Sequence, residues 1–519
     1  MARGLLALVF LSACDPGAAD PVDFSLLDRG APVDARPAAD AAADRAVDPA
    51  ASADATLDAT RDAAVLGDAA PPGIDACVPA CPPQRCGDDG CGGVCGCADG
   101  ATCQAGRCGL AVTNPVLAGD HPDPDVLRVE TPDGPVYYLS HTVHDAGDLP
   151  LYRSRDLVHW ERLPQGAFGR PRQPGASMAI NGAHFCALWA PDLTAIPGGY
   201  LLGVTAMRTA GARDACPPYG EDGGVYQAWS PTPEGPYARP DHPWEPVPAG
   251  ANAATCALRG QLPRSVDYVS RDCQGTFCHH IIRLDSETWQ DPATGRWWMS
   301  YAWFTNVPPR VDWERTHLGE HVSLVELDAA DPFAVRCAAD VPQIFVADGH
   351  DAGLRRALAD SCPGCDAELA FDRGRQGEPL THAGLPWTVV EGPALLRRGD
   401  YVYAFMSGSA WDSAFYHVFW VAARTVEGLA QDAPDRLVGR LLIPSQGQAF
   451  GHGVPVLGPD GEHWFYLHHR LDAARCRAGD CGRDLWITPI DFIDRGDGRG
   501  AVHVAPRRPA EAPEVFIPL

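Results

Sequence analysis

Three acidic residues stand at matching places in three separate strand-like segments. Asp123 lies near the start of the first segment, Asp285 opens another, and Glu391 opens a third. Each is followed by a turn and then by an aromatic-rich run that is typical of a β-strand. Carboxyl groups held in opposite protonation states can act as a general base and a general acid. A third carboxyl group beside the acid would raise its pKa, because like charges disfavour ionisation.

These segments belong to a fivefold repeat that predicts how such side chains could meet. The first strand-like run of each unit starts near residue 123, 189, 285, 391 or 451, and a second run follows at 136–140, 199–202, 296–301, 401–405 or 463–467. Repeated small antiparallel units indicate a β-propeller. The innermost strand of every blade lines the central axis, so the residues at its start should converge on one pocket. One short helix is expected at 351–360.

The ordered motifs resemble those of glycoside hydrolase family 43 from about residue 113 to the end of the chain. They are Pro122-Asp123-Pro124, Trp189-Ala190-Pro191-Asp192, Asp285, Glu391-Gly392-Pro393 and Gly451-His452-Gly453. The resemblance implies an all-β, five-bladed β-propeller of the kind found in arabinofuranosidases, xylosidases and arabinanases. It also implies that Asp123 is the general base, that Glu391 is the general acid, and that Asp285 tunes the pKa of the acid and orients it.

Four further residues are predicted from their places in the repeat. Trp189 could form an aromatic wall for a sugar ring, or it could be a buried blade residue. Trp303 and Arg470 each follow an inner strand and are predicted at the pocket edge. His452 lies at the matching place in the fifth unit, and the resemblance implies that it could help to hold a structural calcium ion or a water cluster, with a purely structural histidine as the alternative. No cofactor is expected to be required.

The sequence departs from the family pattern near two of the predicted catalytic residues. Asp125 places an extra carboxylate two residues after Asp123, and Glu287 is a rival to Asp285. The pocket loops also carry cysteine-bearing insertions. We expect these differences to affect which substrate is bound more than which reaction is catalysed.

Composition excludes some classes of partner and chemistry. The chain has 519 residues and a formal net charge of −26, and a nucleic-acid phosphate backbone would need clustered cations instead. It contains no lysine, so lysine Schiff-base chemistry and lysine-dependent phosphate loops are excluded.

The N-terminal fifth of the chain is predicted to export and tether the catalytic domain. Residues 1–13 resemble a lipoprotein signal peptide, with Cys14 as the lipid-bearing residue and the only contact with the membrane. Residues 14–76 are rich in Ala, Asp and Pro and should form a disordered linker. Residues 77–109 hold eight cysteines and should form a small disulfide module, and residues 110–519 should form the propeller. The expected location is an outer-membrane or cell-surface lipoprotein, or the extracellular medium.

The predicted function is hydrolysis of plant-type polysaccharide or its oligosaccharides with inversion of configuration. Arabinan, arabinoxylan and xylan are the expected substrates. Two alternatives remain open at this stage: a carbohydrate-binding surface propeller without catalysis, and a retaining fructan-active propeller enzyme.

Overall fold

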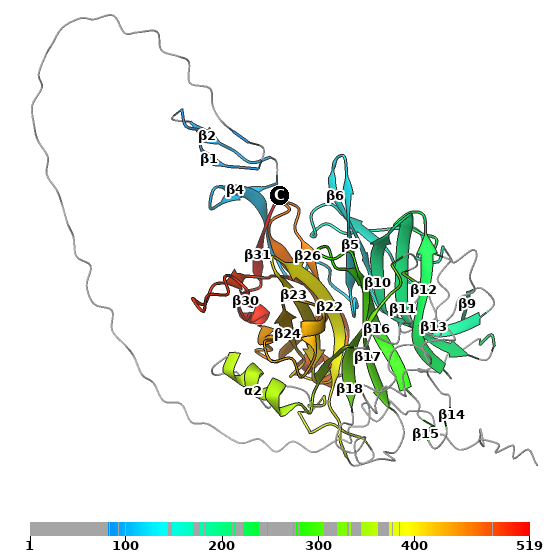
Figure 1. Ribbon diagram of the computed structural model, residues 1–519. Helices are drawn as coiled ribbons and strands as arrows, with labels where there is room; N and C mark the ends of the chain where they lie inside the picture. Colours follow the sequence, from blue (N-terminus) through cyan, green and yellow to red (C-terminus); the bar gives the residue numbers. More distant parts are fainter. Residues whose placement is uncertain are drawn as a thin grey trace, which may run out of the picture.

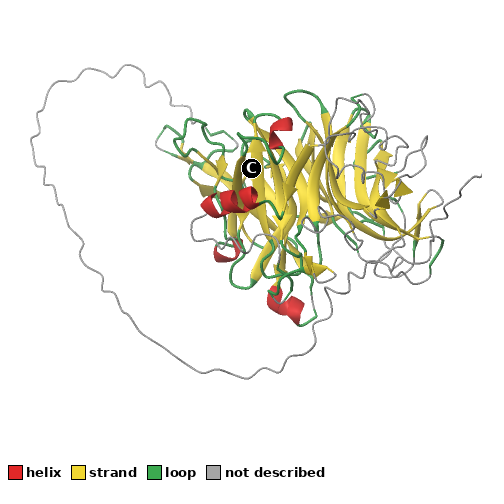
Figure 2. Ribbon diagram, turned by 60° about the horizontal axis from the view of Figure 1, so that its bottom comes forward, coloured by secondary structure: helices red, strands yellow, loops and turns green. Residues whose placement is uncertain are grey.

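Five antiparallel sheets build the body of the molecule (Figures 1 and 2). The computed structural model describes residues 81–519 except at 83, 92, 99, 144–147, 170–176, 181–182, 210, 214–221, 238–245, 248–272, 275–276, 279–280, 306–318, 330–331, 334–343, 362–372, 376, 383–384 and 480. The predicted signal peptide, Cys14, the 14–76 linker and Cys77 lie outside the described residues.

Each sheet is one blade, numbered here in chain order. Blade 1 contains β5 (Asp125–Thr131), β6 (Gly134–Ser140), β7 (Tyr152–Ser154) and β8 (Glu161–Arg162). Blade 2 contains β9 (Met178–Ile180), β10 (Ala183–Ile196), β11 (Gly199–Thr209), β12 (Asp222–Ser230) and β13 (Pro246–Val247). Blade 3 contains β16 (Ile281–Gln290), β17 (Trp297–Thr305), β18 (Glu320–Glu326) and β19 (Ile344–Asp348).

The last two blades complete the domain. Blade 4 contains β22 (Val390–Arg398), β23 (Tyr401–Gly408), β24 (His417–Ala423) and β25 (Leu437–Leu442). Blade 5 contains β26 (Gln448–Leu457), β27 (Trp464–Asp472) and β28 (Arg483–Pro489). The predicted short helix is present as α2 (Ala352–Ser361).

The innermost strands close into a ring. β5 contacts β10, β10 contacts β16, β16 contacts β22, β22 contacts β26, and β26 returns to β5. A closed ring of five sheets is a five-bladed β-propeller, so the fold predicted from the sequence repeat is confirmed.

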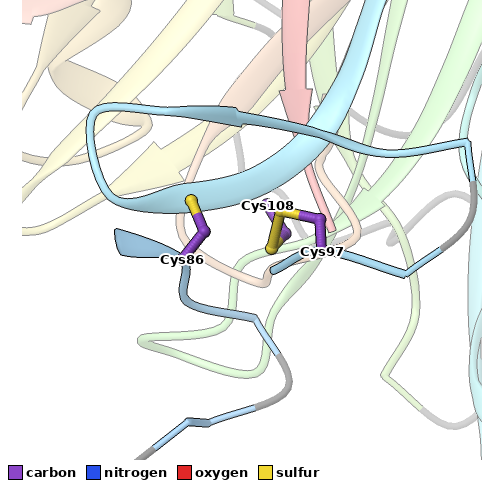
Figure 3. A group of neighbouring side chains, drawn as sticks. All are labelled: Cys86, Cys97 and Cys108. Atoms are coloured by element: carbon purple, nitrogen blue, oxygen red, sulfur yellow. A yellow bond between two sulfur atoms is a disulfide. The ribbon is translucent and has the colours of Figure 1, made fainter. Parts of the chain in front are cut away.

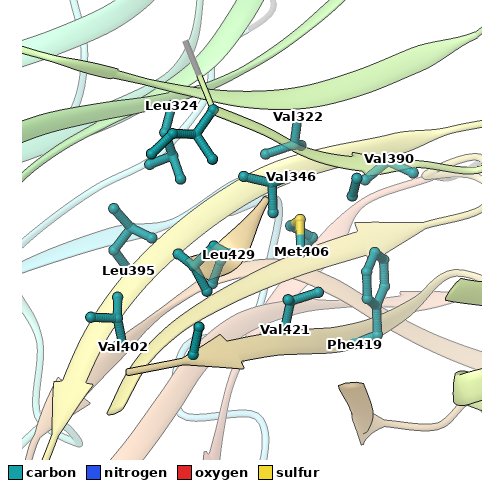
Figure 4. Packing of buried hydrophobic residues seen from close by; sticks show 14 of the residues in the cluster. Val322, Leu324, Val346, Val390, Leu395, Val402, Met406, Phe419, Val421 and Leu429 are labelled. Carbon is teal, nitrogen blue, oxygen red and sulfur yellow. The ribbon is translucent and has the colours of Figure 1, made fainter. Parts of the chain in front are cut away.

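Both faces of a blade are buried, and this explains why its strands are apolar without interruption. Along β23, Val402, Ala404 and Met406 pack into the core between blades 3 and 4. Figure 4 shows Val402 and Met406 in this core. Tyr403 and Phe405 point the opposite way, into the core between blades 4 and 5. Successive side chains alternate between the two faces of a strand, so a strand between two neighbouring blades needs apolar residues at every position.

Residues from both ends of the described chain close the ring at blade 5. The Asn114 side chain donates to the Ile487 carbonyl at 2.8 Å and accepts from the Ile487 amide at 2.9 Å. Leu117 forms a β-bridge with Leu485, which extends blade 5 beyond β28. β4 (Arg107–Thr113) pairs with β31 (Glu514–Pro518), and the two strands lie side by side in Figure 1.

The cysteine-rich module precedes this closure and ends within β4. Its described disulfides join Cys81 to Cys95, Cys86 to Cys103, and Cys97 to Cys108. Figure 3 shows Cys86 beside the Cys97–Cys108 bridge. Cys91 is also disulfide-bonded. The module is therefore joined to the propeller through Cys108 in β4, a strand that it shares with the closing sheet.

We expect Phe405→Ala to lower the free energy of unfolding of the propeller by about 3–5 kcal/mol, because it removes a buried aromatic ring from the interface of two blades. Denaturant unfolding followed by tryptophan fluorescence would measure the change. Val94 is 81% exposed, so Val94→Ala is a control that should leave the propeller transition where it is. An equal effect of both variants would contradict this account of the core.

Peptide mapping of the unreduced protein should recover the three pairs Cys81–Cys95, Cys86–Cys103 and Cys97–Cys108. Their sulfur atoms are crowded in a small module, so scrambled pairs are the meaningful alternative outcome. Recovery of a Cys86–Cys97 or Cys86–Cys108 peptide would contradict the module's architecture.

Candidate active site

The inner strands of all five blades share one backbone irregularity. A residue with positive φ stands at the equivalent place in each, just before β5 in blade 1 and within the inner strand in the others: Asp123 (49°), Ala190 (41°), Asp285 (52°), Gly392 (57°) and His452 (38°). The pairing with the second strand shifts register there in blades 2 to 5, as at a β-bulge. Bulges re-aim side chains, and non-glycine residues adopt positive φ only where their surroundings hold them.

The preceding blade holds each of these residues by its backbone N–H. The acceptors and distances are His469 Nδ1 for Asp123 (3.1 Å), Thr142 Oγ1 for Ala190 (2.7 Å), Thr205 Oγ1 for Asp285 (2.8 Å), Asp285 Oδ2 for Gly392 (3.2 Å) and Ser407 Oγ for His452 (2.8 Å). Four acceptors lie in or just after the second strand of the preceding blade. The fifth is Asp285 itself, so the carboxyl group of blade 3 directly positions the backbone next to Glu391.

Asp123 is surrounded by groups that favour its charged form. Thr142 Oγ1 donates to Oδ2 at 2.7 Å, while Arg483 Nη1 lies 3.3 Å and His452 Nδ1 3.4 Å from Oδ1. Burial favours the neutral acid, but the Arg483 guanidinium and His452 overcome it and hold the pKa of Asp123 well below its usual range. Asp123 is therefore a carboxylate at neutral pH and can accept a proton from water.

Arg483 is itself fixed from several sides. Its guanidinium stacks 4.6 Å from the centre of the Trp411 ring, and its backbone N–H donates to Asp120 Oδ1 at 3.1 Å. Its carbonyl accepts from the backbone N–H of His121 at 2.7 Å. The residue is 3% exposed, so its charge is little screened by water.

Glu391 lies in the opposite kind of environment. The carboxyl group is buried, and Tyr416 donates its hydroxyl to Oε1 at 2.7 Å. Burial raises the pKa of Glu391 to about 7, even though the Tyr416 hydroxyl opposes the shift. Glu391 can therefore keep a proton near neutral pH and donate it.

Asp285 interacts with the surroundings of both Asp123 and Glu391. Its Oδ2 accepts from the Gly392 N–H and lies 3.9 Å from His452 Nδ1. Burial raises the pKa of Asp285 well above its usual range, and the nearby Glu391 and Asp123 add to the shift. The structure thus brings together Asp123, Asp285, Glu391 and His452, from blades 1, 3, 4 and 5.

A second layer of carboxyl groups lies two residues further along three of the inner strands. Asp125 accepts from the Leu193 N–H at 2.6 Å and Asp192 from the Thr288 N–H at 2.7 Å. Glu287 accepts from the Leu395 N–H at 2.5 Å. Each carboxyl group therefore links its blade to the next one. These contacts give Asp125 and Glu287, which stood out in the sequence beside the predicted catalytic residues, a role in joining blades.

The predicted sugar-binding residues differ in their surroundings. Trp189 is half-buried next to the Ala190 bulge. Trp303 is 5% exposed, and its Nε1 donates to Ser323 Oγ within blade 3. Arg470 pairs with Asp484 at 3.2 Å within blade 5. Trp303 and Arg470 are thus held inside their own blades, and sugar binding by all three residues stays a prediction.

Several residues near the site were not found from the sequence. Thr142, Glu320, Tyr416 and Arg483 lie outside the repeated motifs. Thr142 and Tyr416 are in connections between strands, and Glu320 and Arg483 begin outer strands. Nothing in their local pattern distinguishes them from ordinary strand and loop residues.

Comparison with known proteins gives matches of limited extent. Residues 112–251 match the model of the glycosyl hydrolases family 43. Over 85 residues, the chain is 33% identical to a protein named xylosidase/arabinosidase 43B from Humicola insolens. That alignment spans 16% of this chain and 14% of the length of the relative.

Two solved structures are among the similar folds. A thermostable family-43 glycoside hydrolase has 16% identity and a TM-score of 0.45, covering 75% of this chain and 97% of that one. An α-L-arabinofuranosidase from Lactobacillus brevis has 15% identity and a TM-score of 0.45, covering 74% of this chain and 94% of that one.

The matched segment 112–251 contains Asp123 and the Trp189-Ala190-Pro191-Asp192 motif. Residues 112–251 are thus similar to the glycosyl hydrolases of family 43, in a chain that also has the ordered motifs and the closed five-bladed ring.

Proposed function

We propose that this protein hydrolyses glycosidic bonds with inversion at the anomeric carbon. Asp123 is the base that takes a proton from the attacking water, and Glu391 is the acid that protonates the leaving oxygen. Asp285 holds the backbone beside Glu391 and opposes ionisation of the acid by its negative charge when ionised. The observation that carries the proposal is the contrast in surroundings: the Arg483 guanidinium lies 3.3 Å from Asp123, whereas Glu391 is buried against the Tyr416 hydroxyl. This contrast lowers the pKa of Asp123 and raises that of Glu391 to about 7.

Because their pKa values shift in opposite directions, Asp123 and Glu391 can take different roles in hydrolysis. An inverting hydrolase needs one ionised and one protonated carboxyl group at the same pH, separated by about 6.5–9.5 Å so that water fits beside the sugar. Arg483 keeps Asp123 ionised, whereas burial keeps a proton on Glu391. The proton gained by Asp123 and the proton lost by Glu391 balance over one turnover, and no redox partner is needed.

We propose plant-type polysaccharides or their oligosaccharides as substrates, namely arabinan, arabinoxylan or xylan. The support is the name of the Humicola insolens relative, which is a xylosidase/arabinosidase. A panel of nitrophenyl glycosides, arabinan and arabinoxylan would test the substrate directly. Binding to these polysaccharides without release of sugar would favour the carbohydrate-binding alternative.

The proposed mechanism requires no metal. His452 directs Nδ1 toward the carboxyl groups of Asp123 and Asp285, so a calcium ion held by this histidine would have to use Nε2. Calcium prefers oxygen ligands, and its binding here stays a prediction.

We also propose that the protein works outside the reducing cytosol, as a lipid-anchored lipoprotein. The described disulfides support an oxidising location. Among the helices in the described part of the chain, none has the length and apolar character needed to cross a membrane.

Replacement of the two proposed catalytic residues should have different effects on different leaving groups. Glu391→Ala should reduce hydrolysis of substrates with poor leaving groups by about 10²–10⁴-fold. The same variant should largely spare substrates with activated aryl leaving groups, because these need little protonation. Asp123→Ala should impair both classes, since attack by water needs its base in either case.

Steady-state kinetics with a series of aryl glycosides would measure this difference, and azide should partly restore the Asp123→Ala variant. If Glu391→Ala lost activity equally on every leaving group, Glu391 would not be the acid.

Inversion can be tested independently of any mutation. Proton NMR of the first sugar released should show the anomer opposite to that of the substrate, before mutarotation mixes the two forms. A first product that retains the substrate's configuration would exclude Asp123 as a base acting through water, and would favour a retaining mechanism.

A further inference from the structure

A fourth acidic residue, Glu320, lies against the proposed acid. It opens β18 in blade 3, is 7% exposed, and its carboxyl group lies within hydrogen-bonding reach of that of Glu391 in blade 4. The mechanism above does not use this residue.

A close backbone approach between two blades fixes this contact. Gly319 forms a parallel β-bridge with Thr388, and the Glu320 N–H donates to the Thr388 carbonyl at 2.9 Å. A Cβ atom at residue 319 would lie 2.2 Å from that carbonyl oxygen, and the φ of Gly319 is 135°. Only glycine can satisfy both conditions. Glu320 is therefore held beside the start of β22, where Glu391 lies.

The hydrogen bond between the two carboxyl groups requires a proton, because an ionised carboxylate can only accept. Glu391 already accepts the Tyr416 hydroxyl on Oε1. Oε2 of Glu320 is buried, and no N–H or hydroxyl group in the part of the chain that the structure describes donates to it. A buried charge left without partners is costly, so Glu320 is better accommodated as the neutral acid that donates.

The surrounding charges favour the same assignment. Burial raises the pKa of Glu320 well above its usual range, and Glu391 and Asp285 raise it further. The titratable or charged groups that act on the pair are Asp123, Asp285, Tyr416 and Arg483. The only cation among them, Arg483, affects Glu391 and is engaged by Asp123.

We propose that Glu320 is a positioning residue, kept as a neutral carboxylic acid, that donates a hydrogen bond to Glu391. This inference rests on the proposed role of Glu391 as the acid. When Glu391 gives its proton to the leaving oxygen, its new negative charge accepts hydrogen bonds from Glu320 and Tyr416. Glu320 keeps its own proton throughout, so the overall proton balance of hydrolysis is unchanged.

Two substitutions at residue 320 test the proposal in opposite ways. Glu320→Gln keeps a neutral side chain of the same shape with an N–H donor, so the alkaline limb of the kcat/KM profile should stay within about 0.3 pH units of its original position. Glu320→Leu removes the donor, so the pKa of Glu391 should rise and the limb should move upward by about one pH unit. The Leu variant should also lose about tenfold in kcat for poor leaving groups, with little change for activated ones.

An ionised Glu320 would give the opposite result for the Gln variant. Removal of a negative charge beside Glu391 would move the alkaline limb to lower pH, and this outcome would overturn the proposal. Glu326→Gln is the matched control, because Glu326 lies on the same strand but pairs with Arg296. It should leave the pH profile unchanged. Thermal unfolding of each variant would separate a loss of folding from a change in protonation.

A measurement without substrate separates this inference from the proposed function. The infrared difference spectrum of the wild-type protein minus Glu320→Gln, at pH 8, should contain the C=O band of a protonated carboxylic acid. Its absence, with only a carboxylate band lost, would overturn the proposal whatever the protein hydrolyses. If the band is present but no glycoside is cleaved, the proposed function fails while the protonation of Glu320 stands.

Discussion

The site depends on one backbone feature, the positive-φ residue in each inner strand whose N–H is bonded to the preceding blade. This conformation is unfavourable for Asp123, Asp285 and His452 as isolated residues, and it persists only because a neighbouring blade satisfies the displaced N–H. Ring closure and site geometry are therefore coupled. If one blade shifted, its acceptor would no longer bind the N–H of the positive-φ residue in the next blade. The functional side chain at that residue would then point in a different direction.

The opposite protonation states of Asp123 and Glu391 follow from the position of one nearby guanidinium. Asp123 and Glu391 are both removed from most solvent, which by itself favours neutral acids. The difference is Arg483, which contacts Asp123 directly, whereas the direct partners of Glu391 are the hydroxyl of Tyr416 and the carboxyl group of Glu320. One guanidinium therefore makes two similar carboxyl groups differ in charge at the same pH.

The inner strands could be predicted from the sequence, but their partners could not. Asp123, Asp285 and Glu391 stand at or next to the same place in the inner strands of three blades, so the propeller's symmetry predicts that they meet. Glu320 and Arg483 begin outer strands, and each reaches the site through a contact between blades distant in sequence. In β27, Arg470 pairs with Asp484, while the neighbouring His469 reaches Asp123. Side chains alternate between the faces of a strand, so which of two neighbouring residues reaches the site depends on the register of the strand.

The position of Asp123 at the seam of the ring links stability to catalysis. Blades 1, 2 and 3 are each joined to the next blade by Asp125, Asp192 or Glu287, but the equivalent residues in blades 4 and 5 are Ala394 and Val454. At the seam between blades 5 and 1 the joining contacts instead come from the segment that leads to Asp123, in which Gly119 and His121 donate backbone N–H groups to blade 5. The segment that closes the propeller therefore also carries the proposed base. Loosening of this seam would move Asp123 away from Arg483 and raise its pKa from the depressed value, so the difference in protonation between Asp123 and Glu391 would become smaller.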